Sequence, residues 1–180
     1  MTRYRFFTAT SLDGFLADEH DSLDWLLFQP TGDESILPYD DFIAAVGAFV
    51  TGRTTSDWVL EHDGDVEGAW VFTQPTFLFT HRPIAEPRSG ITAVSGPPAE
   101  QRGAIEVAAD GKDVWIVGGG DLAAEFARAG MLDEVCVSIA PVTLGTGRPL
   151  MGGRFDLELR ELGRSGAFLE ARYEVVGERR

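Results

Sequence analysis

The feature that most constrains the fold is an apolar run that stops at three consecutive glycines, directly before a helix-like segment. Residues 114–117 read as a buried strand, and residues 122–129 read as a short helix with one apolar side. Gly118, Gly119 and Gly120 therefore occupy a strand-to-helix turn, where backbone N–H groups carry a partial positive charge. Two interpretations are open: a tight turn in which glycine relieves strain, and a site where an anion approaches the backbone.

Two earlier apolar segments also end at residues suited to holding phosphate. Residues 48–50 and 76–79 are short predicted strands. The residues that follow them are Gly52, Arg53, Thr54 and Thr55 in the first case, and Thr80, His81 and Arg82 in the second. An arginine there is often merely solvated, and a threonine often caps a helix. Because parallel strands share one carboxyl edge, three such turns together favour a site for the phosphates of a dinucleotide.

Strand-like and helix-like segments alternate along most of the chain. The other predicted elements are strands at 3–10, 91–94 and 134–140, and helices at about 39–46 and 98–109. This alternation is typical of parallel strands joined by crossover helices. Residues 155–159 and 166–175 alternate in polarity, which predicts an antiparallel hairpin. The sequence therefore predicts a single α/β domain over residues 1–180, with three αβα layers and a mixed, mostly parallel sheet.

The composition disfavours several classes of protein. A chain of 180 residues with 44% hydrophobic side chains can bury one substantial core. Its 15 Lys and Arg against 29 Asp and Glu give a formal charge of -14, which disfavours binding to nucleic acid or to anionic membranes. We find no apolar run long enough for a signal peptide or a membrane span, which predicts a cytoplasmic protein.

One cysteine and three histidines leave little scope for thiol or metal chemistry. Cys136 lies in an alternating strand pattern, so we expect a buried core residue without a disulfide. His20, His62 and His81 lack the spacing of metal ligands, so no metal site is expected.

Four segments together resemble a known family. They are residues 11–17 (SLDGFLA), 51–55 (TGRTT), 117–120 (VGGG) and 132–145 (LDEVCVSIAPVTLG). In this order they resemble the dihydrofolate reductase superfamily, in particular stand-alone reductases similar to the C-terminal reductase domain of the riboflavin-biosynthesis deaminase-reductase. The resemblance spans nearly the whole chain and implies a dihydrofolate-reductase-like fold.

The resemblance also implies NADPH as the cofactor. The positions that would contact it are Ala9, Phe15, Leu16, Gly52, Arg53, Thr54, Thr55, Thr80, His81, Arg82, Val117, Gly118, Gly119, Gly120, Asp121 and Leu122. The adenosine 2′-phosphate would lie near Arg53, His81 and Arg82. The pyrophosphate would lie between the helix starts that follow Gly52 and Gly120, which agrees with the argument from helix termini alone.

Hydride transfer to a C=N or C=O bond also needs a proton, which a carboxyl group can deliver directly or through water. The candidate acids are Asp13, Asp24 and Asp41, and Trp25 and Phe42 are the candidate substrate contacts. Structural roles remain open for several of them. Asp13 can stabilise a turn before a glycine, Asp41 can occupy the first turn of a helix, and Trp25 can anchor a loop.

The chain departs from its named relatives where they bind substrate. Asp24-Trp25 and an insertion at 29–38 replace the Pro-Trp arrangement of dihydrofolate reductases, and residues 56–59 differ from the riboflavin-pathway reductase. We therefore expect a reductase of a pterin-like, ribosylaminopyrimidine-like or carbonyl substrate, with a non-catalytic NADP-binding module as the alternative. Related domains pair through sheet edges, so a homodimer formed through residues 155–175 is expected.

Overall fold

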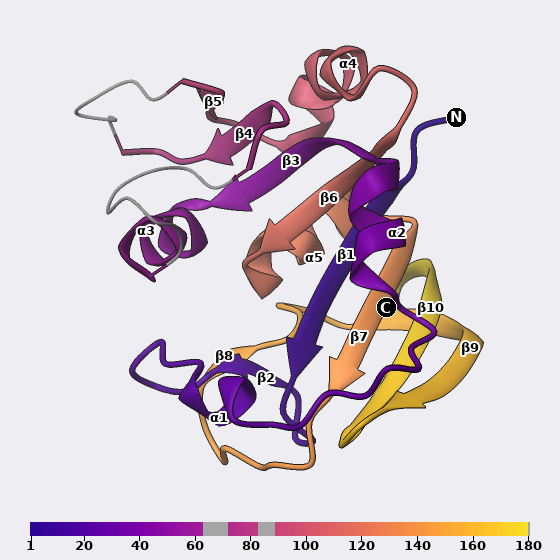
Figure 1. Cartoon of the computed structure of the whole chain (residues 1–180). Helices are drawn as coiled ribbons and strands as arrows, with labels where there is room; N and C mark the ends of the chain where they lie inside the picture. The colour runs from indigo at the N-terminus through magenta and orange to yellow at the C-terminus, as the bar shows by residue number, and fades with distance from the viewer. Residues whose placement is uncertain (63–71, 83–88, 180) are drawn as a thin grey trace.

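The computed structural model describes residues 1–62, 72–82 and 89–179, and an eight-stranded sheet runs through its centre (Figure 1). In spatial order the strands are β5 (Ile91–Val94), β4 (Thr76–Phe79), β3 (Val46–Gly52), β6 (Asp113–Gly118), β1 (Tyr4–Thr10), β7 (Glu134–Ile139), β10 (Phe168–Glu178) and β9 (Phe155–Ser165). The strands from β5 to β7 in this order are parallel, whereas β10 and β9 are antiparallel to their neighbours. The predicted mixed sheet with an antiparallel C-terminal hairpin is confirmed.

Helices cover both faces of the sheet because alternate side chains of its central strands point in opposite directions. The helices are α1 (Asp24–Leu27), α2 (Tyr39–Ala45), α3 (Arg53–His62), α4 (Pro98–Ala109) and α5 (Gly120–Arg128). Phe49 and Trp115 pack against Phe42 of α2 on one face. Val50 and Ile116 belong to the core on the other face, together with residues of α4 and α5. The three predicted layers are therefore present.

Several elements are longer than the apolar patterns that predict them. β3 begins at Val46, where the sequence predicts the end of a helix. A Cβ atom on Gly47 would lie 2.1 Å from the carbonyl oxygen of Ala109, so this glycine lets β3 pass close to the end of α4. β9 extends to Ser165 because its pairing with β10 continues through two register shifts. Backbone pairing thus continues where the side-chain pattern is irregular.

A small second sheet is not among the predicted elements. It consists of β2 (Phe15–Ala17) and β8 (Arg148–Pro149), which pair antiparallel. Strands of 3 and 2 residues are too short to show a periodic pattern. A Cβ atom on Gly147 would lie 2.1 Å from the carbonyl oxygen of Ala17, so glycine is needed where β8 meets β2. In Figure 1 this sheet lies beyond the carboxyl ends of the central strands.

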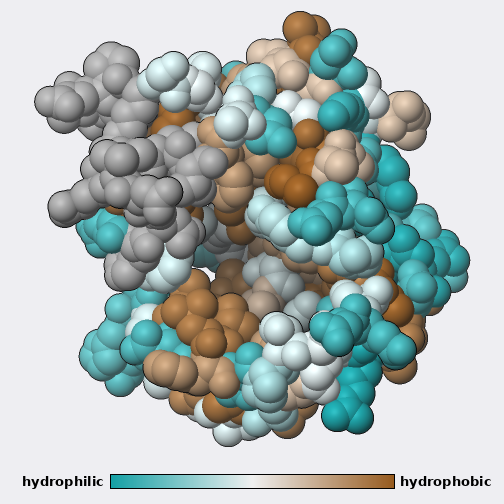
Figure 2. Space-filling view, in the orientation of Figure 1, coloured by the Kyte–Doolittle hydropathy of each residue, from teal (hydrophilic) through white to brown (hydrophobic). Residues whose placement is uncertain are grey.

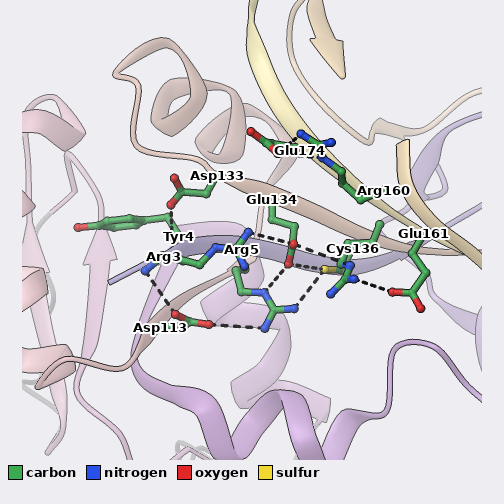
Figure 3. Close-up of polar contacts among 11 residues, drawn as sticks. Arg3, Tyr4, Arg5, Asp113, Asp133, Glu134, Cys136, Arg160, Glu161 and Glu174 are labelled. Atoms are coloured by element: carbon green, nitrogen blue, oxygen red, sulfur yellow. Dashed lines mark hydrogen bonds and ion pairs between the residues drawn. The ribbon is translucent and has the colours of Figure 1, made fainter. Parts of the chain in front are cut away.

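The environment of Cys136 is structural, as the sequence predicts. Its side chain is fully buried on β7, and burial raises the pKa of the thiol to about 12. Beside it, the buried Glu134 accepts hydrogen bonds from Arg3 Nη2 at 3.1 Å and from Arg5 Nε at 2.7 Å (Figure 3). These ion pairs join β1 and the residue before it to β7.

Within the described ranges, we find no helix long and apolar enough to cross a membrane. The same residues contain no group of three His, Cys, Asp or Glu side chains that could hold a metal ion. The side chain of His62 lies outside the described part of the chain.

Candidate functional site

A cleft of about 440 Å³ opens where β3, β4, β5 and β6 end. It lies between the start of α3 and the β2–β8 sheet, where Figure 2 shows the surface hollowed near the centre of the view. The predicted cofactor residues that line it are Leu16, Gly52, Arg53, Thr54, Thr55, Thr80, His81, Val117, Gly118, Gly119, Gly120, Asp121 and Leu122. The structure therefore brings all three predicted strand-end turns to one cleft.

Three predicted cofactor residues are not among those that line the cleft. Ala9 is half-buried within β1. Phe15 pairs with Pro149 in the small sheet. Arg82 is exposed, and its backbone N–H donates to Thr80 Oγ1 at 3.1 Å.

Each of the three consecutive glycines is needed for a different structural reason. A Cβ atom on Gly118 would lie 2.8 Å from Thr55 Oγ1 on α3. Gly119 has a φ of +76°, a conformation that side chains disfavour. A Cβ atom on Gly120 would lie 2.3 Å from the carbonyl oxygen of Pro149 on β8. The turn therefore requires glycine to pack against α3 and β8, and the same turn lines the cleft.

Two helices begin at this cleft. α3 starts at Arg53 directly after β3, and α5 starts at Gly120 directly after the glycine turn. The N-cap residue of α5 is Gly119, so no side chain caps this helix. The N–H groups in the first turn of a helix have no partner within it, and they attract anions. The cleft thus offers two helix starts to a ligand with more than one anionic group.

Arg53 and His81 both line the cleft. Arg53 Nε lies 2.8 Å from both carboxylate oxygens of Asp57, one helical turn further along α3. This ion pair orients the guanidinium at the rim, where about a third of the side chain is exposed. Two of the three residues predicted to contact a 2′-phosphate therefore share one cavity, and Arg82 lies outside its lining.

Asp13 holds a loop together and is not among the residues that line the cleft. Its carboxylate accepts hydrogen bonds from the Ser11 hydroxyl at 2.6 Å and from the N–H groups of Leu144 and Gly145 at 3.1 and 2.7 Å. The hydrogen bond from Ser11, followed by that from Gly145, holds the pKa of Asp13 below its ordinary value. The turn-stabilising interpretation of this residue thus has a direct structural basis.

The other predicted acids and aromatic residues are also not among the residues that line the main cleft. Asp24 is exposed at the start of α1, and Asp41 is exposed in the first turn of α2. Asp41 and Phe42 line a second cavity of about 180 Å³. Phe42 is buried there and stacks on Phe7 with ring centroids 4.2 Å apart. Trp25 is half-buried on α1, and its buried indole N–H has no hydrogen-bond partner among the described residues.

The cleft also contains residues that the sequence reasoning missed. Ser95 and Gly96 follow β5, so they repeat the strand-end pattern a fourth time and were detectable from it. Asp21 and Arg148 form an ion pair at the rim. This pair joins Arg148 on β8 to Asp21 in the turn that follows β2, 127 positions away, and no local signal marks it.

We expect the Asp13 carboxyl to titrate below 3.8, the ordinary aspartate value. Because its folded pKa is lowered, its contribution to stability is present above the unfolded pKa and is lost as the pH falls through the folded pKa. Thermal melts from pH 7 down to about pH 2 should show a smaller acid-induced decrease in Tm for Asp13→Asn than for the wild type. The exposed Asp33→Asn is the control, and an equal decrease in Asp13→Asn and the wild type would contradict the assignment.

Comparison with known proteins agrees with this architecture. A family model described as the RibD C-terminal domain matches residues 104–166. Uncharacterized protein YwjB of Bacillus subtilis (strain 168) is 30% identical over 146 residues, which cover 80% of this chain and 79% of YwjB. The fold and the cleft define an α/β protein with a cavity at the carboxyl edge of its sheet. The chain belongs to the RibD C-terminal domain family, and its fold is dihydrofolate-reductase-like.

Two solved structures extend the likeness to nearly the whole chain. A putative riboflavin biosynthesis protein from Shewanella sp. PV-4 superposes with a TM-score of 0.80 at 25% identity, covering 97% of this chain and 99% of that one. A pyrimidine reductase-like protein from Corynebacterium diphtheriae gives a TM-score of 0.67 at 16% identity, covering 98% and 93%. The second likeness concerns the fold alone.

Proposed function

We propose that this protein is an NADPH-dependent reductase that transfers a hydride to a small heterocyclic or carbonyl substrate. A ribosylaminopyrimidine-like compound is the leading substrate class. Membership in the RibD C-terminal domain family and the likeness to a putative riboflavin biosynthesis protein support this choice. Pterin-like and simple carbonyl compounds are the other classes.

The observation that carries the proposal is the meeting of two helix starts and Arg53 in one cleft. NADPH carries a pyrophosphate and a 2′-phosphate, and helix-start N–H groups and guanidinium groups are suited to such anions. The start of α5 and the hydroxyls of Thr54 and Thr55 would hold the pyrophosphate, and Arg53 with His81 would hold the 2′-phosphate. The donor set therefore fits the cofactor.

When bound, NADPH supplies the hydride, and the protein supplies position and surroundings. Leu16, Phe79, Val117 and Leu122 give the cleft apolar lining. Apolar side chains exclude water from a bound ring and strengthen the polar contacts around it. In this proposal the helix starts and Arg53 bind the phosphates, and the apolar side chains shelter the reacting part of the ligand.

Replacing Arg53 by alanine is expected to weaken NADPH binding by about tenfold or more, because hydrogen bonds to charged groups contribute roughly 1.5–3 kcal/mol. NADH lacks the 2′-phosphate, so its affinity should change little. Fluorescence titration of both nucleotides measures the difference. Arg160→Ala is a matched control, because Arg160 is also ion-paired, to Glu174, and is not among the residues that line the cleft.

Two outcomes would count against the proposal. Absence of NADPH binding by the wild type would overturn the proposed function itself. An equal loss of affinity for NADPH and NADH in Arg53→Ala would overturn only the assignment of Arg53 to the 2′-phosphate.

A second candidate function is a non-catalytic NADP-binding module. It is favoured by one observation: none of Asp13, Asp24 and Asp41 is among the described residues that line the main cleft. Oxidation of NADPH should be followed with ribosylaminopyrimidine, dihydrofolate and simple carbonyl compounds. Turnover of any of them supports the reductase, whereas NADPH binding without oxidation of the whole panel supports the module.

A further inference from the structure

Several charged side chains line the cleft near the start of α5. Asp21, Asp121 and Glu125 supply carboxylates, and the described lining residues include two arginines, Arg53 on α3 and Arg148 on β8. Asp121 lies in the first turn of α5, where a bound anion would be held. An anion there would meet carboxylates unless a cation offset them.

The geometry points to Arg148 as that cation, and we propose that it binds the pyrophosphate of the dinucleotide at the start of α5. This inference rests on the proposed function, because it assumes that a dinucleotide occupies the cleft. Arg148 is not among the residues that the sequence patterns or the family resemblance single out.

The position of Arg148 next to α5 follows from backbone packing. The carbonyl oxygen of the following residue, Pro149, lies so close to Gly120 that a Cβ atom there would be 2.3 Å away. The N–H of Gly152 donates to the carbonyl oxygen of Gly120 at 3.3 Å. β8 is therefore fixed against the first residue of α5, and Arg148 projects from this strand at the cleft.

Asp21 holds Arg148 in a defined orientation. Arg148 Nε donates to Asp21 Oδ1 at 2.6 Å, and Nη2 donates to Oδ2 at 2.9 Å. Asp21 reaches this position with a φ of +62°, in a turn where Asp18 Oδ1 accepts hydrogen bonds from the N–H groups of His20 and Ser22. An arginine has five N–H donors, so two bonds to Asp21 leave capacity for a phosphate.

The exposure of the pair agrees with a role in binding. The side chains of Arg148 and Asp21 are 59% and 36% exposed, and exposed ion pairs contribute little to stability. The hydrogen bonds to Asp21, and to a smaller extent the charge of Asp121 in the first turn of α5, raise the pKa of the Arg148 guanidinium. A ligand phosphate at the start of α5 would attract the Arg148 guanidinium in addition to Asp21, which already orients it.

The test compares Arg148→Ala with the wild type in titrations of NADPH and NADH. Both nucleotides contain the pyrophosphate, so we expect both affinities to fall by about tenfold or more. Raising the salt concentration should weaken NADPH binding less steeply in Arg148→Ala, because one charge contact is lost. Arg160→Ala, an ion-paired arginine outside the described lining, is the control and should bind like the wild type.

Asp21→Ala separates binding from structural support. This variant breaks the same ion pair but keeps the Arg148 cation, so it should lose less affinity than Arg148→Ala. Equal losses in the two variants would mean that the pair only supports the β2–β8 sheet, which overturns the proposal. Unchanged binding by Arg148→Ala, or a loss confined to NADPH, would also overturn it. If the wild type binds neither nucleotide, the proposed function fails instead.

Discussion

Replacing Phe126 by alanine is expected to lower the free energy of unfolding by about 3–5 kcal/mol, the range typical of large-to-small changes in a packed core. Phe126 lies on α5 and is fully buried. Its ring centroid lies 5.7 Å from that of Tyr4 on β1 and 5.5 Å from that of Phe79 on β4. Truncation leaves a cavity between the helix and the sheet. Because the surrounding core is closely packed, this cavity can close only if the helix or the sheet moves.

Urea denaturation of Phe126→Ala and the wild type measures this effect. Val107→Ala is the control, because Val107 is 82% exposed on α4 and its loss should change stability by about 0.5 kcal/mol or less. A decrease below about 1 kcal/mol in Phe126→Ala would show that the core collapses around the site. The result also bears on the cleft, because Phe126 lies on α5 and the first residue of this helix, Gly120, lines the cleft.

Replacing Gly120 by alanine is expected to disrupt both stability and ligand binding. The added Cβ atom would lie 2.3 Å from the carbonyl oxygen of Pro149 and 2.6 Å from that of Leu150. Both are backbone atoms, so either β8 or the start of α5 must move. We expect a loss of about 1–3 kcal/mol in the free energy of unfolding, typical of overpacking. Displacement of the helix start should weaken NADPH binding beyond the effect of destabilisation alone.

Gly103→Ala gives a control of opposite sign. Gly103 lies within α4, and a Cβ atom there would meet nothing within 4 Å. Alanine in a helix interior is favoured over glycine by roughly 0.5–1 kcal/mol, so this variant should gain stability and keep its affinity for NADPH. If Gly120→Ala matched the wild type in urea denaturation and in titration, the close packing of β8 on α5 would be contradicted.

The sequence predicts those parts of the fold that a local apolar pattern encodes. β4, β5 and α4 begin and end at the predicted residues. β4 and β5 are short apolar runs, and a helix places its apolar residues at a period of 3.6, so both kinds of element are visible in the chain itself. The order of the strands in the sheet, by contrast, has no local signal.

Most of the predicted cofactor residues line one cleft, whereas the predicted acids are not among its lining residues. The same contrast between local and distant contacts explains this difference. The turns after β3, β4 and β6 meet because parallel strands end at a common edge, a rule that applies without knowledge of side-chain packing. The position of Asp13, by contrast, depends on a loop whose path is set by distant contacts. Asp13 is held by backbone N–H groups 131 and 132 residues away.

By itself, then, the sequence determined a mostly parallel α/β sheet with an antiparallel hairpin, and a glycine turn placed where an anion can approach a helix start. Only the tertiary structure decided why each of the three glycines is needed, since Gly118 packs on Thr55 and Gly120 on Pro149. It also decided that Arg148 reaches the same cleft. Local patterns record burial and backbone conformation, whereas contacts between distant segments exist only once the chain has folded.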